Sequence, residues 1–128
     1  MGNKPSTKSI YKGLLETESL KNPLLVNMLA LKEMDIEYHP DSTSKYWHVC
    51  KVEIPAGQLE ELSAQLSKEM KRGWYAVFWN NSKIAVIFAE KIFRIPKQDY
   101  HKSGEYRKMR EYGLANGVQE KYLSLQID

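Results

Sequence analysis

Apolar and polar residues follow a strand pattern most clearly in the second half of the chain. Residues 74–79 and 84–89 are rich in aromatic and β-branched side chains, and Asn80-Asn81-Ser82 between them tolerates the backbone of a tight hairpin. A break at Glu90-Lys91 returns the chain into residues 92–95. These segments predict a meander of three antiparallel strands.

A strand and a helix are predicted directly before the meander. Residues 46–54 alternate, with His48 and Cys50 on one face and Trp47 on the other. Leucine and methionine then recur every three or four positions, which predicts an amphipathic helix over residues 56–72.

The two ends of the chain have weaker patterns. Residues 1–21 are predicted to be a flexible tail. Asn22-Pro23 is typical of a helix start and predicts a helix over residues 23–32, followed by a short strand over residues 36–41. After the meander, a helix is predicted from Ser103 to about residue 112, and alternation over residues 122–127 predicts a final strand.

These elements predict a single α+β domain over residues 22–128. Their order, βαββ(β)αβ after an initial helix, is close to the ferredoxin-like plan, in which two helices cover one face of an antiparallel sheet. We therefore expect a two-layer sandwich with its helices on one face of the sheet. The other face would be open and would carry several aromatic side chains.

Composition narrows the class of protein but not its activity. The 128 residues are 42% hydrophobic, which suits one domain with its own core, and the net charge of +3 requires no anionic partner. The sequence has no long apolar run and no pattern of a secretory signal, so we expect a cytoplasmic protein without a membrane partner. The single cysteine, Cys50, cannot form an internal disulfide.

Three segments resemble known proteins. Residues 46–55 read Tyr-Trp-His-Val-Cys-Lys-Val-Glu-Ile-Pro, residues 73–80 read Gly-Trp-Tyr-Ala-Val-Phe-Trp-Asn, and residues 112–117 read Tyr-Gly-Leu-Ala-Asn-Gly. In these strand and turn residues the chain, from about Tyr46 to its C-terminus, resembles a family of small conserved bacterial and archaeal proteins of unassigned function. The resemblance supports the fold and implies no catalytic residue.

The predicted strands carry more aromatic side chains than one core face can absorb. We therefore interpret the open sheet face as the binding surface of a non-enzymatic module, for a small ligand, a protein partner or a second copy of the chain. The candidate binding residues are Trp47, Tyr75, Val77 and Trp79. No cofactor is expected.

Single-stranded nucleic acid is an alternative ligand. Residues 71–79, Lys-Arg-Gly-Trp-Tyr-Ala-Val-Phe-Trp, partly resemble the basic, glycine and aromatic run of RNA-recognition motifs, whose exposed rings stack on bases. One extra residue after Gly73 shifts the aromatic side chains to the other strand face relative to that run. The candidate nucleic-acid-binding residues are Arg72, Trp74, Tyr75, Arg107, Lys108 and Arg110.

An enzyme centred on His48 and Cys50 is a third reading. The two residues share a strand face, and a thiol beside an imidazole is the minimum for nucleophilic catalysis. They are also two donors of the three or four that a zinc site needs, but His39, Asp41 and His101 show no ligand spacing. A buried thiol and a histidine at the rim of the core explain the same pattern, and no metal site is predicted.

Overall fold

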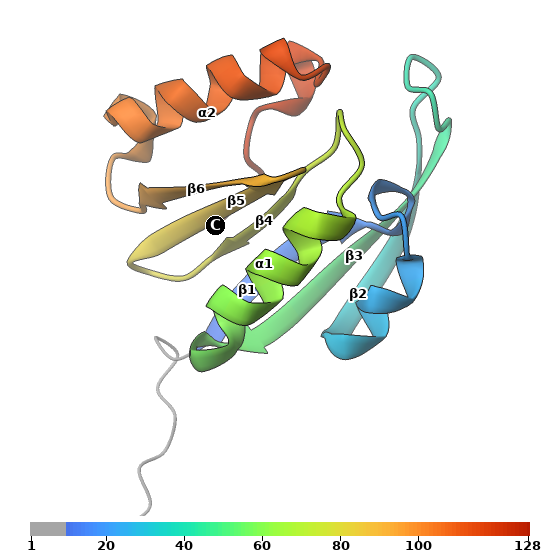
Figure 1. Cartoon of the computed structure of the whole chain (residues 1–128), viewed down its shortest axis with the longest axis horizontal. Helices are drawn as coiled ribbons and strands as arrows, with labels where there is room; N and C mark the ends of the chain where they lie inside the picture. Colours follow the sequence, from blue (N-terminus) through green and yellow to red (C-terminus); the bar gives the residue numbers. More distant parts are fainter. Residues whose placement is uncertain (1–9) are drawn as a thin grey trace, which may run out of the picture.

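The structure, a computed structural model, describes residues 10–128 and has the α+β class that the sequence predicts (Figure 1). Six strands form one sheet in the order β2-β3-β1-β4-β5-β6, and every neighbouring pair is antiparallel. The strands are β1 (Ile10–Glu16), β2 (Ala30–Tyr38), β3 (Tyr46–Pro55), β4 (Ala76–Trp79), β5 (Lys83–Phe88) and β6 (Lys91–Pro96). The two α-helices are α1 (Leu59–Glu69) and α2 (Gly104–Ala115).

The N-terminal strand β1 lies in the middle of the sheet, between β3 and β4. The predicted tail is therefore wrong for residues 10–21, whereas residues 1–9 lie outside the described part. Tyr11 and Leu15 are buried on one face of β1, but Gly13 interrupts their alternation. A Cβ atom at Gly13 would lie 2.3 Å from the ring of Phe78, so close packing requires glycine here. Because Gly13 breaks the apolar alternation, the sequence pattern did not reveal this strand.

The predicted N-terminal helix is wrong beyond its first turns. Asn22 does cap a helix start, since its side chain accepts a hydrogen bond from the backbone N–H of Leu24. The segment is a short 3-10 helix, η3 (Pro23–Met28), and the chain is already extended from Ala30. Eight residues of β2 pair with β3, and this pairing determines the conformation here despite the helical spacing of the leucines.

The central elements were predicted correctly, and their boundaries moved by a few residues. The strand β3, the helix α1 and the meander β4-β5-β6 lie where the sequence places them. Ser103 caps α2 by accepting a hydrogen bond from the backbone N–H of Tyr106 at 3.1 Å. The predicted final strand does not form. Leu123 and Leu125 are buried instead against the sheet, so their alternation serves core packing.

The two α-helices cover opposite faces of the sheet, which corrects the expected two-layer arrangement (Figure 1). Leu62 and Leu66 of α1 pack in one core cluster with Phe78, whereas Met109 of α2 packs in a second cluster with Val77. Adjacent residues of a strand point to opposite faces, so the two clusters lie on the two sides of β4. The split βαβ plan places both helices on one face and is therefore not observed.

Candidate ligand-binding pocket

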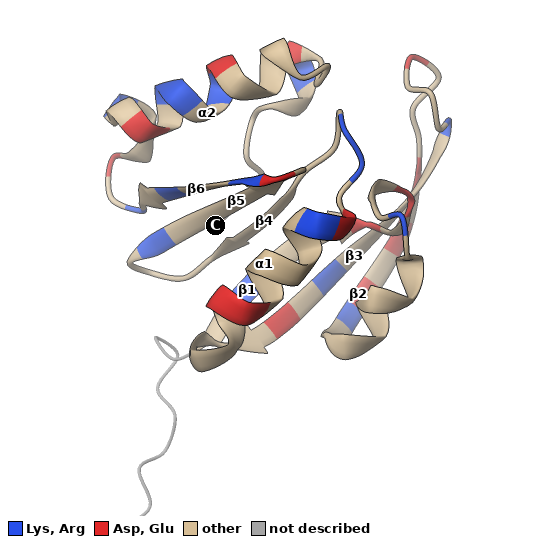
Figure 2. Cartoon of the chain, in the orientation of Figure 1, with Lys and Arg blue, Asp and Glu red and all other residues tan. Residues whose placement is uncertain are grey.

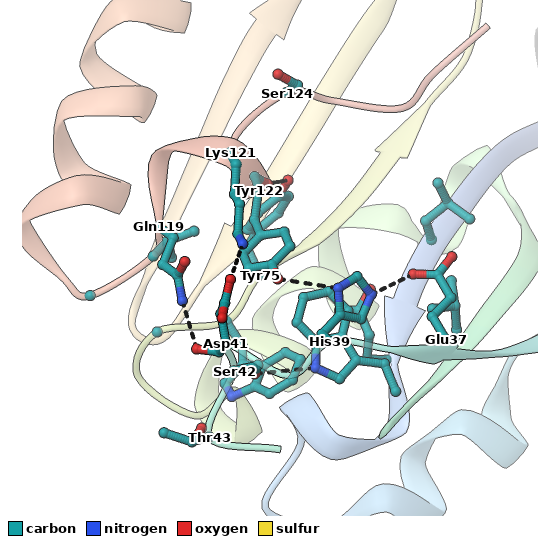
Figure 3. Close-up of a pocket in the computed structure, with 18 of the residues that line it drawn as sticks. Glu37, His39, Asp41, Ser42, Thr43, Tyr75, Gln119, Lys121, Tyr122 and Ser124 are labelled. Carbon is teal, nitrogen blue, oxygen red and sulfur yellow. Dashed lines mark hydrogen bonds and ion pairs between the residues drawn. The ribbon is translucent and has the colours of Figure 1, made fainter. Parts of the chain in front are cut away.

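A pocket of about 600 Å³ lies on the α2 side of the sheet, over the part that α2 does not cover. Its floor is formed by Leu14 and Glu16 of β1, Val49 of β3 and Val77 of β4. Its walls come from the loop between β2 and β3, from residues 72–75 and from residues 116–126 after α2 (Figure 3). Three distant parts of the sequence therefore enclose one cavity.

Two contacts tie the β2–β3 loop to the C-terminal segment. The Lys121 ammonium lies 2.7 Å from the Asp41 carboxylate, and the Gln119 side chain donates a hydrogen bond to the Asp41 carbonyl at 3.0 Å. Figure 3 shows both contacts at one side of the pocket. The Lys121 ammonium also holds the pKa of the Asp41 carboxyl below its ordinary value. The loop and the C-terminal segment thus form a continuous wall.

Several aromatic rings lie in the pocket wall. The imidazole of His39 stacks on Trp47 with ring centroids 3.7 Å apart, and Trp74 and Tyr122 lie 5.0 and 4.9 Å from the Trp47 ring. The indole N–H of Trp47 donates to the Ser44 carbonyl at 2.8 Å. Because that polar atom is satisfied, the ring is held in place and offers mainly apolar surface.

A chain of hydrogen bonds fixes the polar groups of this wall. The imidazole of His39 lies between the hydroxyl of Tyr122, 3.2 Å from Nδ1, and the carboxylate of Glu37, 2.8 Å from Nε2. The Tyr75 hydroxyl donates to the carbonyl of Tyr122. These contacts appear in Figure 3 and orient four side chains from three segments.

Glu16 is the unusual residue of the pocket floor. Burial raises the pKa of its carboxyl to about 7, and the nearby charges of Glu37 and Glu18 raise it further, although a hydrogen bond to its own backbone opposes them. No other residue among 10–128 forms a hydrogen bond or ion pair with this side chain. A partly buried acid without a partner therefore faces the cavity, and such perturbed groups cluster at functional sites.

Three of the four predicted binding residues line the pocket, namely Trp47, Tyr75 and Val77. Trp79 does not. It is 6% exposed beneath the C-terminal segment, where its indole N–H donates to the Asp128 carboxylate at 2.7 Å. This sheet face is thus covered around Trp79, and the pocket lies over β1, β3 and Val77 of β4, which differs from the uniformly open face that we expected.

The candidate nucleic-acid-binding residues fall into two groups. Arg72, Trp74 and Tyr75 line the pocket, whereas Arg107, Lys108 and Arg110 lie on α2. Arg107 and Lys108 are exposed, and Arg110 lies 3.3 Å from the Glu120 carboxylate. Figure 2 shows basic and acidic residues mixed along α2, with no continuous basic stripe.

In the described part of the chain, the imidazole of His48 forms no hydrogen bond with the thiol of Cys50. Nδ1 of His48 lies 2.5 Å from the Glu18 carboxylate, whereas the Cys50 sulfur lies 3.8 Å from the carbonyl oxygen of His48. The thiol is fully buried, and burial raises its pKa above the ordinary value. A thiolate nucleophile is disfavoured in such surroundings.

Several pocket residues had no signal in the sequence. Glu16 fell in the predicted tail, His39 in a turn, and Tyr122 in a strand that does not form. Only the long-range packing of β1, the β2–β3 loop and the C-terminal segment brings these residues together. The cluster of turn residues at positions 39–42 marked the loop but not the direction of its side chains.

Residues 10–128 contain no group of three or more His, Cys, Asp or Glu side chains arranged to hold a metal ion. None of the helices in this described part has the length and apolar character that crossing a membrane requires. No protein-family model, curated protein or solved structure matches the chain. The resemblance to a family of small bacterial and archaeal proteins stays a prediction, and the pocket carries the functional argument.

Proposed function

We propose that the chain is a small-molecule-binding protein and that the pocket beside β1 and β3 is its binding site. One observation carries the proposal: a 600 Å³ cavity joins an aromatic wall to an unpartnered carboxyl on its floor. Sites for small ligands are typically cavities of about 300–1,000 Å³, largely apolar, with a few polar groups that fix orientation.

The wall is organised before a ligand arrives, which favours binding. Trp47, His39 and Tyr122 contact one another, and their polar atoms bond to neighbouring residues or the backbone. A ligand that enters would therefore immobilise few side chains, and each immobilised side chain would oppose binding by about 0.5–1.5 kcal/mol.

Self-association through the free sheet edge is less well supported. The edge strand β2 presents Glu33, Asp35 and Glu37 on one face. Two copies of the chain could pair their β2 strands antiparallel, related by a two-fold axis perpendicular to the sheet. In this arrangement an acid of one copy would lie opposite an acid of the other. Like charges in directly opposite positions destabilise a sheet.

Single-stranded nucleic acid is also less well supported by the pocket. Trp74 and Tyr75 are partly buried in the wall of the pocket, so they do not form an exposed platform on which successive bases could stack. The carboxyls of Glu16, Glu37 and Asp41 line the same cavity and repel a phosphate backbone.

Three compounds that share a phenyl ring and differ in charge test the proposal: 2-phenylethylamine, 2-phenylethanol and 3-phenylpropanoate. We expect at least one to shift the NMR signals of the Trp47 and Trp74 indoles with a Kd of about 1 mM, which suits a fragment of this size. The Trp79 indole, outside the pocket, should shift little.

The variant Val49→Phe supplies the control, because it fills the pocket floor without changing charge. Its folding is checked by circular dichroism, and it should lose the shifts. Saturable binding that V49F retains would place the site elsewhere, and unshifted spectra with all three compounds at 10 mM would overturn the proposed function. Salt-sensitive shifts with a short RNA would favour the nucleic-acid alternative instead.

A further inference from the structure

Among residues 10–128, the charged side chains that line the pocket bond to another residue of the protein, except Glu16 on the floor. Lys121 forms an ion pair with Asp41, and the Glu37 carboxylate lies within hydrogen-bond distance of the His39 imidazole. Arg72 is exposed at the rim, where its guanidinium donates to the carbonyl of Ala115 at 3.5 Å. Glu16 is the remaining charged group of the pocket among residues 10–128, and it has no cationic partner.

We propose that the pocket binds an organic ammonium ion, in which a primary or secondary amine donates to the Glu16 carboxylate and an apolar body packs against Trp47 and Tyr75. This inference rests on the proposed function and specifies the ligand class of the same site. Nothing in the amine is altered on binding, so the protein acts as a receptor for it.

The floor and the wall favour the same kind of ion. An ammonium group provides N–H donors for a carboxylate, and hydrogen bonds between two charged groups are about twice as strong as neutral ones. Aromatic faces attract cations through their quadrupole, and this attraction increases when water is excluded. The rings of Trp47, Trp74 and Tyr75 line the same pocket as this carboxyl.

The surrounding acids extend the preference for a positive charge. The Glu37 carboxylate lines the pocket from β2, and the Glu18 carboxylate lies close enough to Glu16 to raise its pKa. Both disfavour an anion at the floor. The single carboxylate of Glu16 and the neighbouring rings do not supply the six or more oxygen ligands of a calcium site, so an organic cation fits better than a metal ion.

The experiment compares 2-phenylethylamine with its neutral analogue 2-phenylethanol by NMR titration at pH 8. The wild-type protein should bind the amine at least about tenfold more tightly, since a charge-assisted hydrogen bond is gained. In Glu16→Gln the amine should lose most of this advantage, and the alcohol should bind as in the wild type. Asp35→Asn, which removes an exposed acid outside the pocket, should change neither Kd.

A pH series is a second and independent measurement. The amine stays charged between pH 5.5 and 8, but Glu16 becomes protonated below its raised pKa. The affinity for the amine should therefore fall about tenfold as the pH is lowered from 8 to 5.5. Equal affinities for amine and alcohol, or an E16Q variant that keeps its preference for the amine, would overturn the inference and leave the proposed function standing. If neither compound nor 3-phenylpropanoate binds, the proposed function itself fails.

Discussion

The replacement Glu16→Gln isolates the free energy of keeping an ionised carboxyl on the pocket floor. Glutamine has nearly the same shape and stays neutral, so it imitates the protonated acid. We expect E16Q to raise the free energy of unfolding at pH 8 and to change it little at pH 5. A residue that binds a ligand should thus weaken the unliganded fold.

The expected size follows from the raised pKa. The folded protein holds the pKa of Glu16 at about 7, against an ordinary value of 4.5. Between these values the folded state keeps a proton that the unfolded state has released, so the contribution of Glu16 to stability falls as the pH rises. At roughly 1.4 kcal/mol per pKa unit, the loss reaches about 3 kcal/mol at pH 8 and under about 1 kcal/mol at pH 5. Water at the partly exposed carboxyl makes these values upper bounds.

Urea unfolding followed by tryptophan fluorescence measures this effect at pH 5, 6, 7 and 8 in the wild-type protein, E16Q and Asp35→Asn. The difference between E16Q and the wild type should increase with pH, whereas D35N should stay within about 0.5 kcal/mol of the wild type throughout. A difference that does not depend on pH would refute the reasoning, as would an E16Q variant less stable than the wild type at pH 8.

Three further predictions concern the fold. Gly13→Ala should lower the free energy of unfolding by about 1–3 kcal/mol, measured by urea unfolding, because the new Cβ would meet the ring of the fully buried Phe78. The control Gly57→Ala, which has open space at its Cβ, should change the free energy of unfolding by less than about 1 kcal/mol. Ser103→Ala removes the side-chain cap of α2 and should lower the free energy of unfolding, measured by thermal denaturation, by about 1 kcal/mol. Cys50 should react with Ellman's reagent only after unfolding, because it is buried and its pKa is raised, and rapid labelling of the native protein would contradict this placement.

Local patterns in the sequence were sufficient for the elements that form mainly through their own residues. Helix α1, the meander and the capped start of α2 follow from periodicity, turn residues and Ser103. The strand β1 and most of β2 could not be predicted in this way, because their conformation depends on pairing with β3. Only residues 36–38 of β2 fall within the short strand that was predicted over residues 36–41. Gly13 interrupts β1, and every residue of β2 is exposed, so neither strand shows the usual alternation.

The sequence indicated that both faces of the sheet are covered, but we interpreted it as a sheet with one covered face. Val77 and Phe78 are adjacent in β4 and are both buried, and the strand β5 is buried on both faces after Lys83. A continuous apolar run of this kind is typical of a strand covered on both sides. The aromatic surplus therefore belonged partly to a second core, and this explains why Trp79 packs inside while Trp47 reaches the pocket.

Glu16 is the residue at which stability and the proposed binding require opposite properties. An uncharged side chain in its place would remove an unfavourable buried charge, and nothing in the described fold depends on the carboxyl, whose only hydrogen bond is to its own backbone. Local rules that fail without a structural benefit are expected at functional sites. A ligand with a positive charge would reverse the penalty, because its ammonium would supply the partner that the fold lacks. Bound amine should therefore stabilise the wild-type protein more at pH 8 than at pH 5, and in E16Q this difference should vanish.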